Sequence, residues 1–113
     1  MPGMQGVSLT DLVTAQLEEA RTASSGRSST TVHGGREHAL RQTVIALAAG
    51  RTLDEHDSPP EATLLVLYGR VRLSTADDAW EGMASDFLII PDDRHALEAL
   101  EDAAVLLTVA NTL

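Results

Sequence analysis

Residues 50–69 read Gly-Arg-Thr-Leu-Asp-Glu-His-Asp-Ser-Pro-Pro-Glu-Ala-Thr-Leu-Leu-Val-Leu-Tyr-Gly, and the second half of this stretch decides the fold class. Side chains alternate between the two faces of a β-strand, so Ala62, Leu64 and Val66 share one face. Leu65 and Leu67 share the other face, which is therefore apolar as well. A strand of this kind is typical of a two-layer sandwich or of a dimer interface.

Short apolar runs of the same kind continue outward from this stretch. From Thr30 onward they are broken by turn residues at intervals of about ten positions, as in all-β domains. The predicted strands cover residues 30–33, 37–48, 51–55, 62–68, 70–75, 79–81, 86–90, 95–100 and 103–110. The sequence therefore predicts an all-β fold, a small jelly-roll barrel, preceded by one short helix.

That helix is expected near the N-terminus, where the apolar periodicity is helical. Ser8 and Asp11 have the spacing of an N-cap, and the residues that follow predict an amphipathic helix over 9–22. Its apolar stripe consists of Leu9, Leu12, Val13, Leu17 and Ala20, with Gln16 as the one polar residue among them. Residues 24–29 have the composition of a flexible connector. We therefore divide the chain into a helix and linker (1–29) and a barrel domain (30–113).

The composition excludes several classes of function. A chain of 113 residues has the length of one compact domain. It contains no cysteine, which excludes disulfides, thiolate catalysis and cysteine-ligated zinc. All of its basic residues are arginine, so Schiff-base and P-loop chemistry are excluded too. A formal charge of −9 repels phosphate backbones, and we expect no nucleic-acid partner.

We also expect no membrane partner. No apolar run approaches the roughly 20 residues of a membrane-spanning helix. The first residues, Met-Pro-Gly-Met-Gln, lack the basic and then apolar pattern of a signal peptide. The sequence is that expected of a cytoplasmic protein.

The stretch 50–95 resembles the two conserved motifs of cupins, in particular small single-domain bacterial cupins. Gly50 to His56, the loop around Pro59 and the strand ending at Gly69 keep the spacing of the first motif. In the second, Ser85-Asp86 stands where the family usually has Gly-Asp, Ile90-Pro91 keeps its place, and His95 arrives one residue early. The resemblance implies a jelly-roll (double-stranded β-helix) barrel and a homodimer.

The same resemblance locates the positions that hold a metal ion in metal-binding cupins. There the first motif supplies His-x-His and then Glu, and the second supplies a further His. His56 matches, but Ser58 stands at the second His position and Ala62 at the Glu position. Such centres need about three converging protein ligands, so we expect no bound metal cofactor. If Fe, Mn, Zn or Ni is held after all, His56, His95 and Glu61 are the expected ligands.

Two functions remain open from the sequence. The first is a small-molecule-binding protein in which His56, Ser58 and His95, with Arg41 or Gln42, contact a small polar or anionic ligand. Leu64, Val66, Leu88 and Ile90 would form the apolar wall of its pocket. The alternative is a metal-dependent cupin enzyme of the dioxygenase, isomerase or decarboxylase type that uses His56 and His95. A dimerising protein with no ligand, whose two histidines are ordinary polar residues at the barrel mouth, is a third interpretation.

Overall fold

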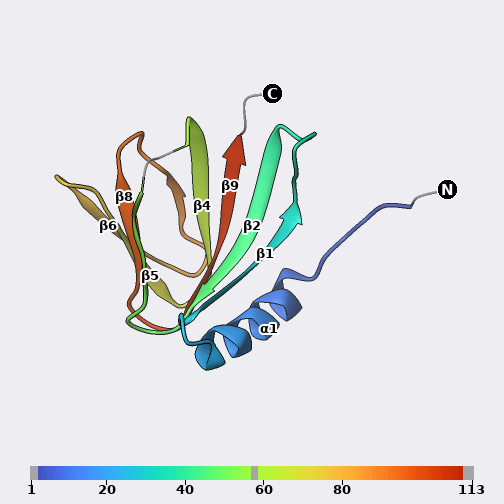
Figure 1. The fold of residues 1–113 in the computed structure, drawn as a ribbon, viewed down its shortest axis with the longest axis horizontal. Helices are drawn as coiled ribbons and strands as arrows, with labels where there is room; N and C mark the ends of the chain where they lie inside the picture. Colours follow the sequence, from blue (N-terminus) through green and yellow to red (C-terminus); the bar gives the residue numbers. More distant parts are fainter. Residues whose placement is uncertain (1–2, 57–58, 111–113) are drawn as a thin grey trace.

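The computed structural model describes residues 3–56 and 59–110, and it confirms the predicted all-β jelly-roll barrel with one short helix (Figure 1). The helix is α1 (Leu9–Thr22). The strands are β1 (Arg27–His33), β2 (Leu40–Leu47), β3 (Thr52–His56), β4 (Glu61–Tyr68), β5 (Arg70–Ser74), β6 (Ala79–Met83), β7 (Phe87–Ile89), β8 (His95–Ala99) and β9 (Ala103–Ala110).

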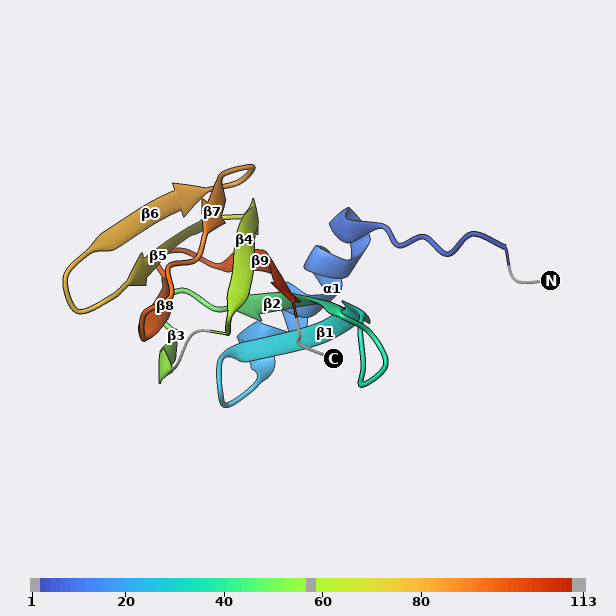
Figure 2. The same cartoon turned by 90° about the horizontal axis from the view of Figure 1, so that it is seen from above.

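The strands form two antiparallel sheets that face each other. The five-stranded sheet has the order β1-β2-β9-β4-β7, and the four-stranded sheet has the order β3-β8-β5-β6. Figures 1 and 2 show the two layers side by side, with α1 against the β1–β2 part of the larger sheet. Strands far apart in sequence are neighbours in the larger sheet, because β9 pairs with both β2 and β4.

Two apolar clusters lie on opposite sides of the five-stranded sheet. The inner cluster fills the space between the sheets and includes Leu47, Val66 and Val105. The outer cluster lies between the sheet and α1 and includes Val44, Ala46, Ala104 and the helix residues Val13, Leu17 and Ala20. Alternation along β2 and β9 supplies one set of side chains to each cluster. The helix therefore explains why these strands are apolar on both faces.

The polar residue on the helix stripe is also accounted for. Gln16 is only 6% exposed, and buried amides need hydrogen-bond partners. Its Nε2 donates to Thr30 Oγ1 at 2.6 Å, and its Oε1 accepts from the hydroxyl of Ser28. Both partners lie on β1, so this strand presents hydroxyl groups to the helix where β2 presents apolar side chains.

All nine predicted strands are present, and the largest differences lie at the start of β1 and at the start of β2. The predicted connector 24–29 is shorter, because residues 27–29 already belong to β1 and pair with residues 45–47 of β2. Gly26, with a φ of +70°, makes the turn that permits this early start. The predicted strand 37–48 begins only at Leu40, after a loop that contains Gly34 and Gly35. The division of the chain into 1–29 and 30–113 stays a prediction.

Several large apolar side chains at the β6–β7 edge are exposed. Met83, Phe87 and Ile89 are the clearest, with Ile89 73% exposed. The expected homodimer stays a prediction.

Within the part of the chain that the structure describes, no helix is long and apolar enough to cross a membrane.

One carboxylate ties the helix to two turns of the barrel. Arg21 Nε donates to Asp102 Oδ2 at 2.7 Å, and the backbone N–H of Ala49 donates to Asp102 Oδ1 at 2.8 Å. The hydrogen bond from Arg21, together with that from Ala49, lowers the pKa of Asp102 below its usual range. Asp102 therefore joins the end of α1, the β2–β3 turn and the β8–β9 turn.

This arrangement predicts a loss of stability in acid. Because the pKa of Asp102 is lower in the folded chain than in the unfolded chain, its contribution is present above the unfolded value near 4 and disappears as the pH falls through the folded value. We expect Asp102→Asn to lower the urea midpoint at pH 7 and to lower it much less at pH 3. Asp77→Asn, at an exposed turn position, is the matched control and should change neither midpoint. An equal loss for Asp102→Asn at both pH values would contradict this account.

Candidate functional site

The two motif segments meet where β3 pairs with β8. The pairing runs from Thr52 opposite Glu98 and Leu53 opposite Leu97 to His56 opposite His95. Between the last two pairs β3 contains one residue more than β8, so a β-bulge lies just before His56. The backbone thus brings the two predicted histidine positions into register. The side chain of His56 and all of Ser58 lie outside the described residues, and their roles stay predictions.

His95 is a buried residue on the inner side of the barrel. It is 4% exposed and alternates with Ala96 in the same way as Leu97 and Ala99, which belong to the inner cluster. Its Nδ1 lies 2.9 Å from the carbonyl oxygen of Asp93, which fixes the plane of the imidazole ring. A buried histidine held in this way can serve as a polar group within an otherwise apolar interior.

The carboxylate position of the metal-binding cupins is apolar here. Ala62 is 3% exposed and belongs to the inner cluster, and Glu61 is exposed on the opposite face of β4. Among the side chains that the structure describes, which do not include that of His56, no three His, Asp or Glu are placed to hold a metal ion together. By sequence, two of the positions that hold a metal ion in metal-binding cupins are serine and alanine, and the absence of a bound metal stays a prediction.

Arg41 and Gln42 lie on opposite faces of β2. Gln42 shares the outer face with Val44 and Ala46, and its Nε2 donates to Thr108 Oγ1 of β9 at 3.2 Å. Arg41 shares the inner face with Ile45 and Leu47, both of which pack in the inner cluster. The sequence left open which of the two residues faces the barrel interior. In the structure that residue is Arg41.

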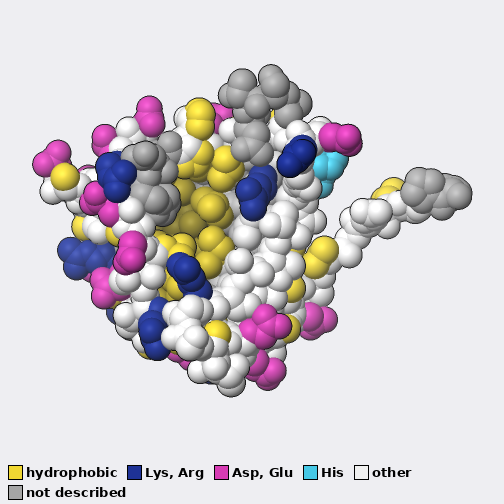
Figure 3. Space-filling model, in the orientation of Figure 1, with side chains coloured by type: hydrophobic (Ala, Val, Ile, Leu, Met, Phe, Trp, Pro, Cys, Tyr) yellow, Lys and Arg dark blue, Asp and Glu magenta, His cyan; other side chains and the backbone are white. Residues whose placement is uncertain are grey.

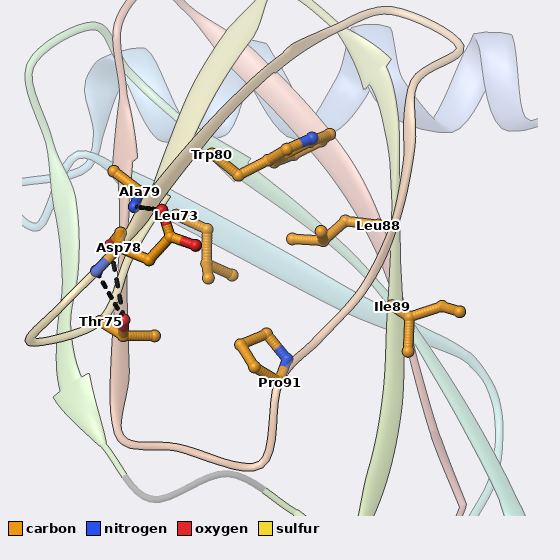
Figure 4. Close-up of a pocket in the computed structure, with 8 residues that line it drawn as sticks. All are labelled: Leu73, Thr75, Asp78, Ala79, Trp80, Leu88, Ile89 and Pro91. Carbon is orange, nitrogen blue, oxygen red and sulfur yellow. Dashed lines mark hydrogen bonds between the residues drawn. The ribbon is translucent and has the colours of Figure 1, made fainter.

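An open apolar cavity of about 240 Å³ lies at the His95 end of the barrel. Leu73 of β5 and Trp80 of β6 are paired across the four-stranded sheet, and Leu88 of β7 and Pro91 complete the wall. In Figure 4 Leu73 and Leu88 face each other across the cavity, with Trp80 and Pro91 at its two ends. The cavity is near the start of β8 because Ser74 pairs with Ala96, next to His95.

The rim of this cavity is polar. The backbone N–H of Asp78 donates to Thr75 Oγ1 at 3.1 Å, and Asp78 Oδ1 accepts from the N–H of Ala79 at 2.8 Å (Figure 4). These bonds hold the β5–β6 turn that forms one side of the opening. An apolar wall with a few fixed polar groups at its rim is the usual design of a small-molecule site.

Of the four residues predicted to form the wall of a pocket beside His56 and His95, one lines this cavity. Leu88 lines the cavity, but Leu64, Val66 and Ile90 are packed in the inner cluster. Leu73 and Trp80 were missed. The signal was present, since alternation within residues 70–75 and 79–81 places both side chains on one face of a hairpin.

Neither a family model nor a curated protein sequence matches the chain. Solved structures do match it. A cupin superfamily protein from Desulfitobacterium hafniense DCB-2 superposes with a TM-score of 0.76 at 15% identity, over 99% of this chain and 95% of that protein. A protein of unknown function from Streptococcus pyogenes gives a TM-score of 0.70 at 24% identity, over 80% and 79% of the two chains. A cupin 2 conserved barrel domain protein from Salinispora arenicola CNS-205 gives 0.68 at 15% identity, over 95% and 88%.

The chain is thus a small jelly-roll barrel with a helix packed on one sheet. It has the cupin fold, as the resemblance of its two motifs implied. At these identities the similarity establishes the fold alone, because proteins with one fold host many unrelated activities.

Proposed function

We propose that this protein is a cupin-fold small-molecule-binding protein that works without the usual metal centre. The observation that carries the proposal is the open apolar cavity lined by Leu73, Trp80, Leu88 and Pro91, in a barrel whose carboxylate position is the buried Ala62. The cavity offers an aromatic face, an aliphatic wall and a polar rim, which suits a compact ligand with an apolar body and a polar or anionic group.

The alternative function is a metal-dependent enzyme that uses His56 and His95. The register of β3 and β8 favours it, because it sets the two residues opposite each other. Two imidazoles without a carboxylate hold a divalent transition metal only weakly. We therefore place this alternative second.

One experiment separates the two functions. The chain has a single tryptophan, and Trp80 lines the cavity, so its fluorescence reports occupancy. We expect protein purified without chelator to contain well below one transition-metal ion per chain, and benzoate to change the Trp80 emission with the same dissociation constant before and after EDTA treatment. About one metal ion per chain, or binding that EDTA abolishes, would favour the enzyme, and His56→Ala should then release the ion.

A pair of variants provides the control for the cavity. Leu88→Phe adds bulk to a side chain that points across the cavity toward Leu73 and should weaken benzoate binding at least tenfold. Leu100→Phe makes the same change at an exposed position that does not line the cavity, and should leave binding unchanged. Equal binding by the parent and by Leu88→Phe would show that the ligand does not occupy this cavity.

A further inference from the structure

The arginines of this acidic protein fall into two groups. Three of them form ion pairs: Arg21 with Asp102 at 2.7 Å, Arg70 with Glu81 at 3.2 Å and Arg94 with Glu55 at 2.9 Å. Arg72 lies between Glu81 and Glu98 in the strand register. Across residues 3–56 and 59–110 no ion pair is formed by the remaining four, which are Arg27, Arg36, Arg41 and Arg51.

Three of these four arginines line two hollows on the inner face of β1 and β2. One hollow, of about 420 Å³, is lined by Thr31, Gly34, Gly35, Arg36 and Arg41. The other, of about 410 Å³, is lined by Ser25, Arg27, Ser28, Ser29, Thr43, Ile45 and Leu53. They adjoin, because the hydroxyl oxygens of Thr31 and Thr43 lie 3.4 Å apart. In Figure 3 dark-blue arginine side chains border a hollow with a hydrophobic floor between the two sheets.

The residues that line the two hollows favour the binding of anions. No carboxylate is among the described residues that line either hollow, although the chain as a whole carries a charge of −9. Guanidinium groups bind carboxylate and phosphate oxygens through paired charge-assisted hydrogen bonds. Hydroxyl groups of Ser29, Thr31 and Thr43 lie between the arginines and can donate to the same ligand.

The β1–β2 loop holds one of the arginines in place. Gly34 has a φ of +138°, and a Cβ built on it would lie 3.0 Å from both Cα and Cγ of Arg41. The stem of Arg41 therefore packs directly on the backbone of the loop. This contact limits the freedom of the side chain, which lowers the entropic cost of binding through its guanidinium.

The spacing of the charges indicates the size of the ligand. Arg27 and Thr31 are four residues apart on one strand, which corresponds to roughly 13 Å. Arg36 and Arg41 lie at the Thr31 end and Arg27 at the other. We propose that Arg27, Arg36 and Arg41, with the hydroxyls between them, form a binding site for an extended organic anion with an acidic group at each end.

This site is separate from the cavity at Trp80. β1 and β7 are the two opposite edges of the five-stranded sheet, and the arginine-lined hollows adjoin β1 whereas the cavity adjoins β7. The inference therefore goes beyond the proposed function, and each site has its own reporter.

The test uses the backbone amide signals of Thr31 and Thr43 in NMR titrations of the full chain. Decanedioate and fructose 1,6-bisphosphate serve as probes, one with carboxylate ends and one with phosphate ends. We expect saturable shifts at both threonines with at least one probe, weaker binding at higher salt, and at least tenfold weaker binding in Arg27→Gln and in Arg41→Gln. The stronger probe identifies the acidic group.

Arg72→Gln is the matched control, because it removes the same charge from the exposed face of the other sheet. It should bind within about twofold of the parent, since its charge lies outside the site. The amide spectra of all three variants should show an intact fold. Absence of saturable shifts with both probes, or an equal loss in all three variants, would overturn the proposal. If benzoate changed the Trp80 emission but neither probe shifted Thr31 or Thr43, this site would be disproved and the proposed function would be unaffected. If the probes shifted Thr31 and Thr43 but benzoate left the Trp80 emission unchanged, only the proposed function would be disproved.

Discussion

Replacing Gly69 by alanine is expected to destabilise the protein by about 3 kcal/mol or more. Gly69 has a φ of +74°, where a side chain costs roughly 1–2 kcal/mol. A Cβ at this position would also lie 2.1 Å from the carbonyl oxygen of Asp102 and 3.0 Å from Cα of Ala103. Both contacts are with backbone, so the β4–β5 turn and the β8–β9 turn would have to separate. Overpacking of this kind adds roughly 1–3 kcal/mol.

Gly50→Ala separates the clash from the backbone strain. Gly50 has a similar φ of +82°, but a Cβ there would meet no atom within 4 Å. We expect it to cost only the strain, about 1–2 kcal/mol. Urea unfolding at pH 7 measures both variants. If the two lost the same stability, close approach of the two turns would not be what requires glycine at position 69.

The second large effect is expected from Ala62→Glu, which restores the carboxylate of the metal-binding cupins. Position 62 is in the inner cluster, and burial raises the pKa of a carboxylic acid by several units. A rise of two to three units up to neutral pH corresponds to about 3–4 kcal/mol of lost stability. The variant should therefore unfold at a much lower urea concentration than the parent. The loss should become smaller at pH 5, where the folded chain can hold the group protonated.

Ala76→Glu is the control for this substitution, because Ala76 is exposed in the β5–β6 turn. It should change the free energy of unfolding by no more than about 0.5 kcal/mol. If Ala62→Glu were equally harmless, position 62 would have access to water or to a bound cation. In that case position 62 would be able to hold a metal-ligating carboxylate.

The sequence predicted the strands well because, in most of them, inward-facing and outward-facing residues alternate with a period of two. Leu64 and Val66 face inward as expected, and β4 ends at the turn glycine Gly69. Motif spacing also predicted that His56 and His95 come together along the backbone. The early start of β1 was missed because Arg27, Ser28 and Ser29 are polar, and polar residues suit an edge strand as well as a linker.

The functional surfaces were harder to predict, for physical reasons. Arg41 and Gln42 could not be assigned to a face because β2 is apolar on both sides, and only the position of α1 distinguishes them. The cavity at Trp80 is lined by strands of both sheets, and no single strand encodes how the two sheets are placed. The arginine-lined hollows arise because the edge strand β1 carries no apolar residue on its inner face, whose members are Arg27, Ser29 and Thr31.

The two clusters on either side of the five-stranded sheet have a consequence for how the molecule folds. β2 and β9 are covered by the barrel interior on one face and by α1 on the other, yet β2 ends at Leu47 and β9 begins only at Ala103. The pairing of β2 with β9, which is covered on both faces, therefore closes a long loop of chain, and pairing between strands far apart in sequence slows folding. The intervening hairpin of β5 and β6 is local and can form early. We infer that docking of β9 between β2 and β4 completes the barrel late and is the step at which helix and barrel become one cooperative unit.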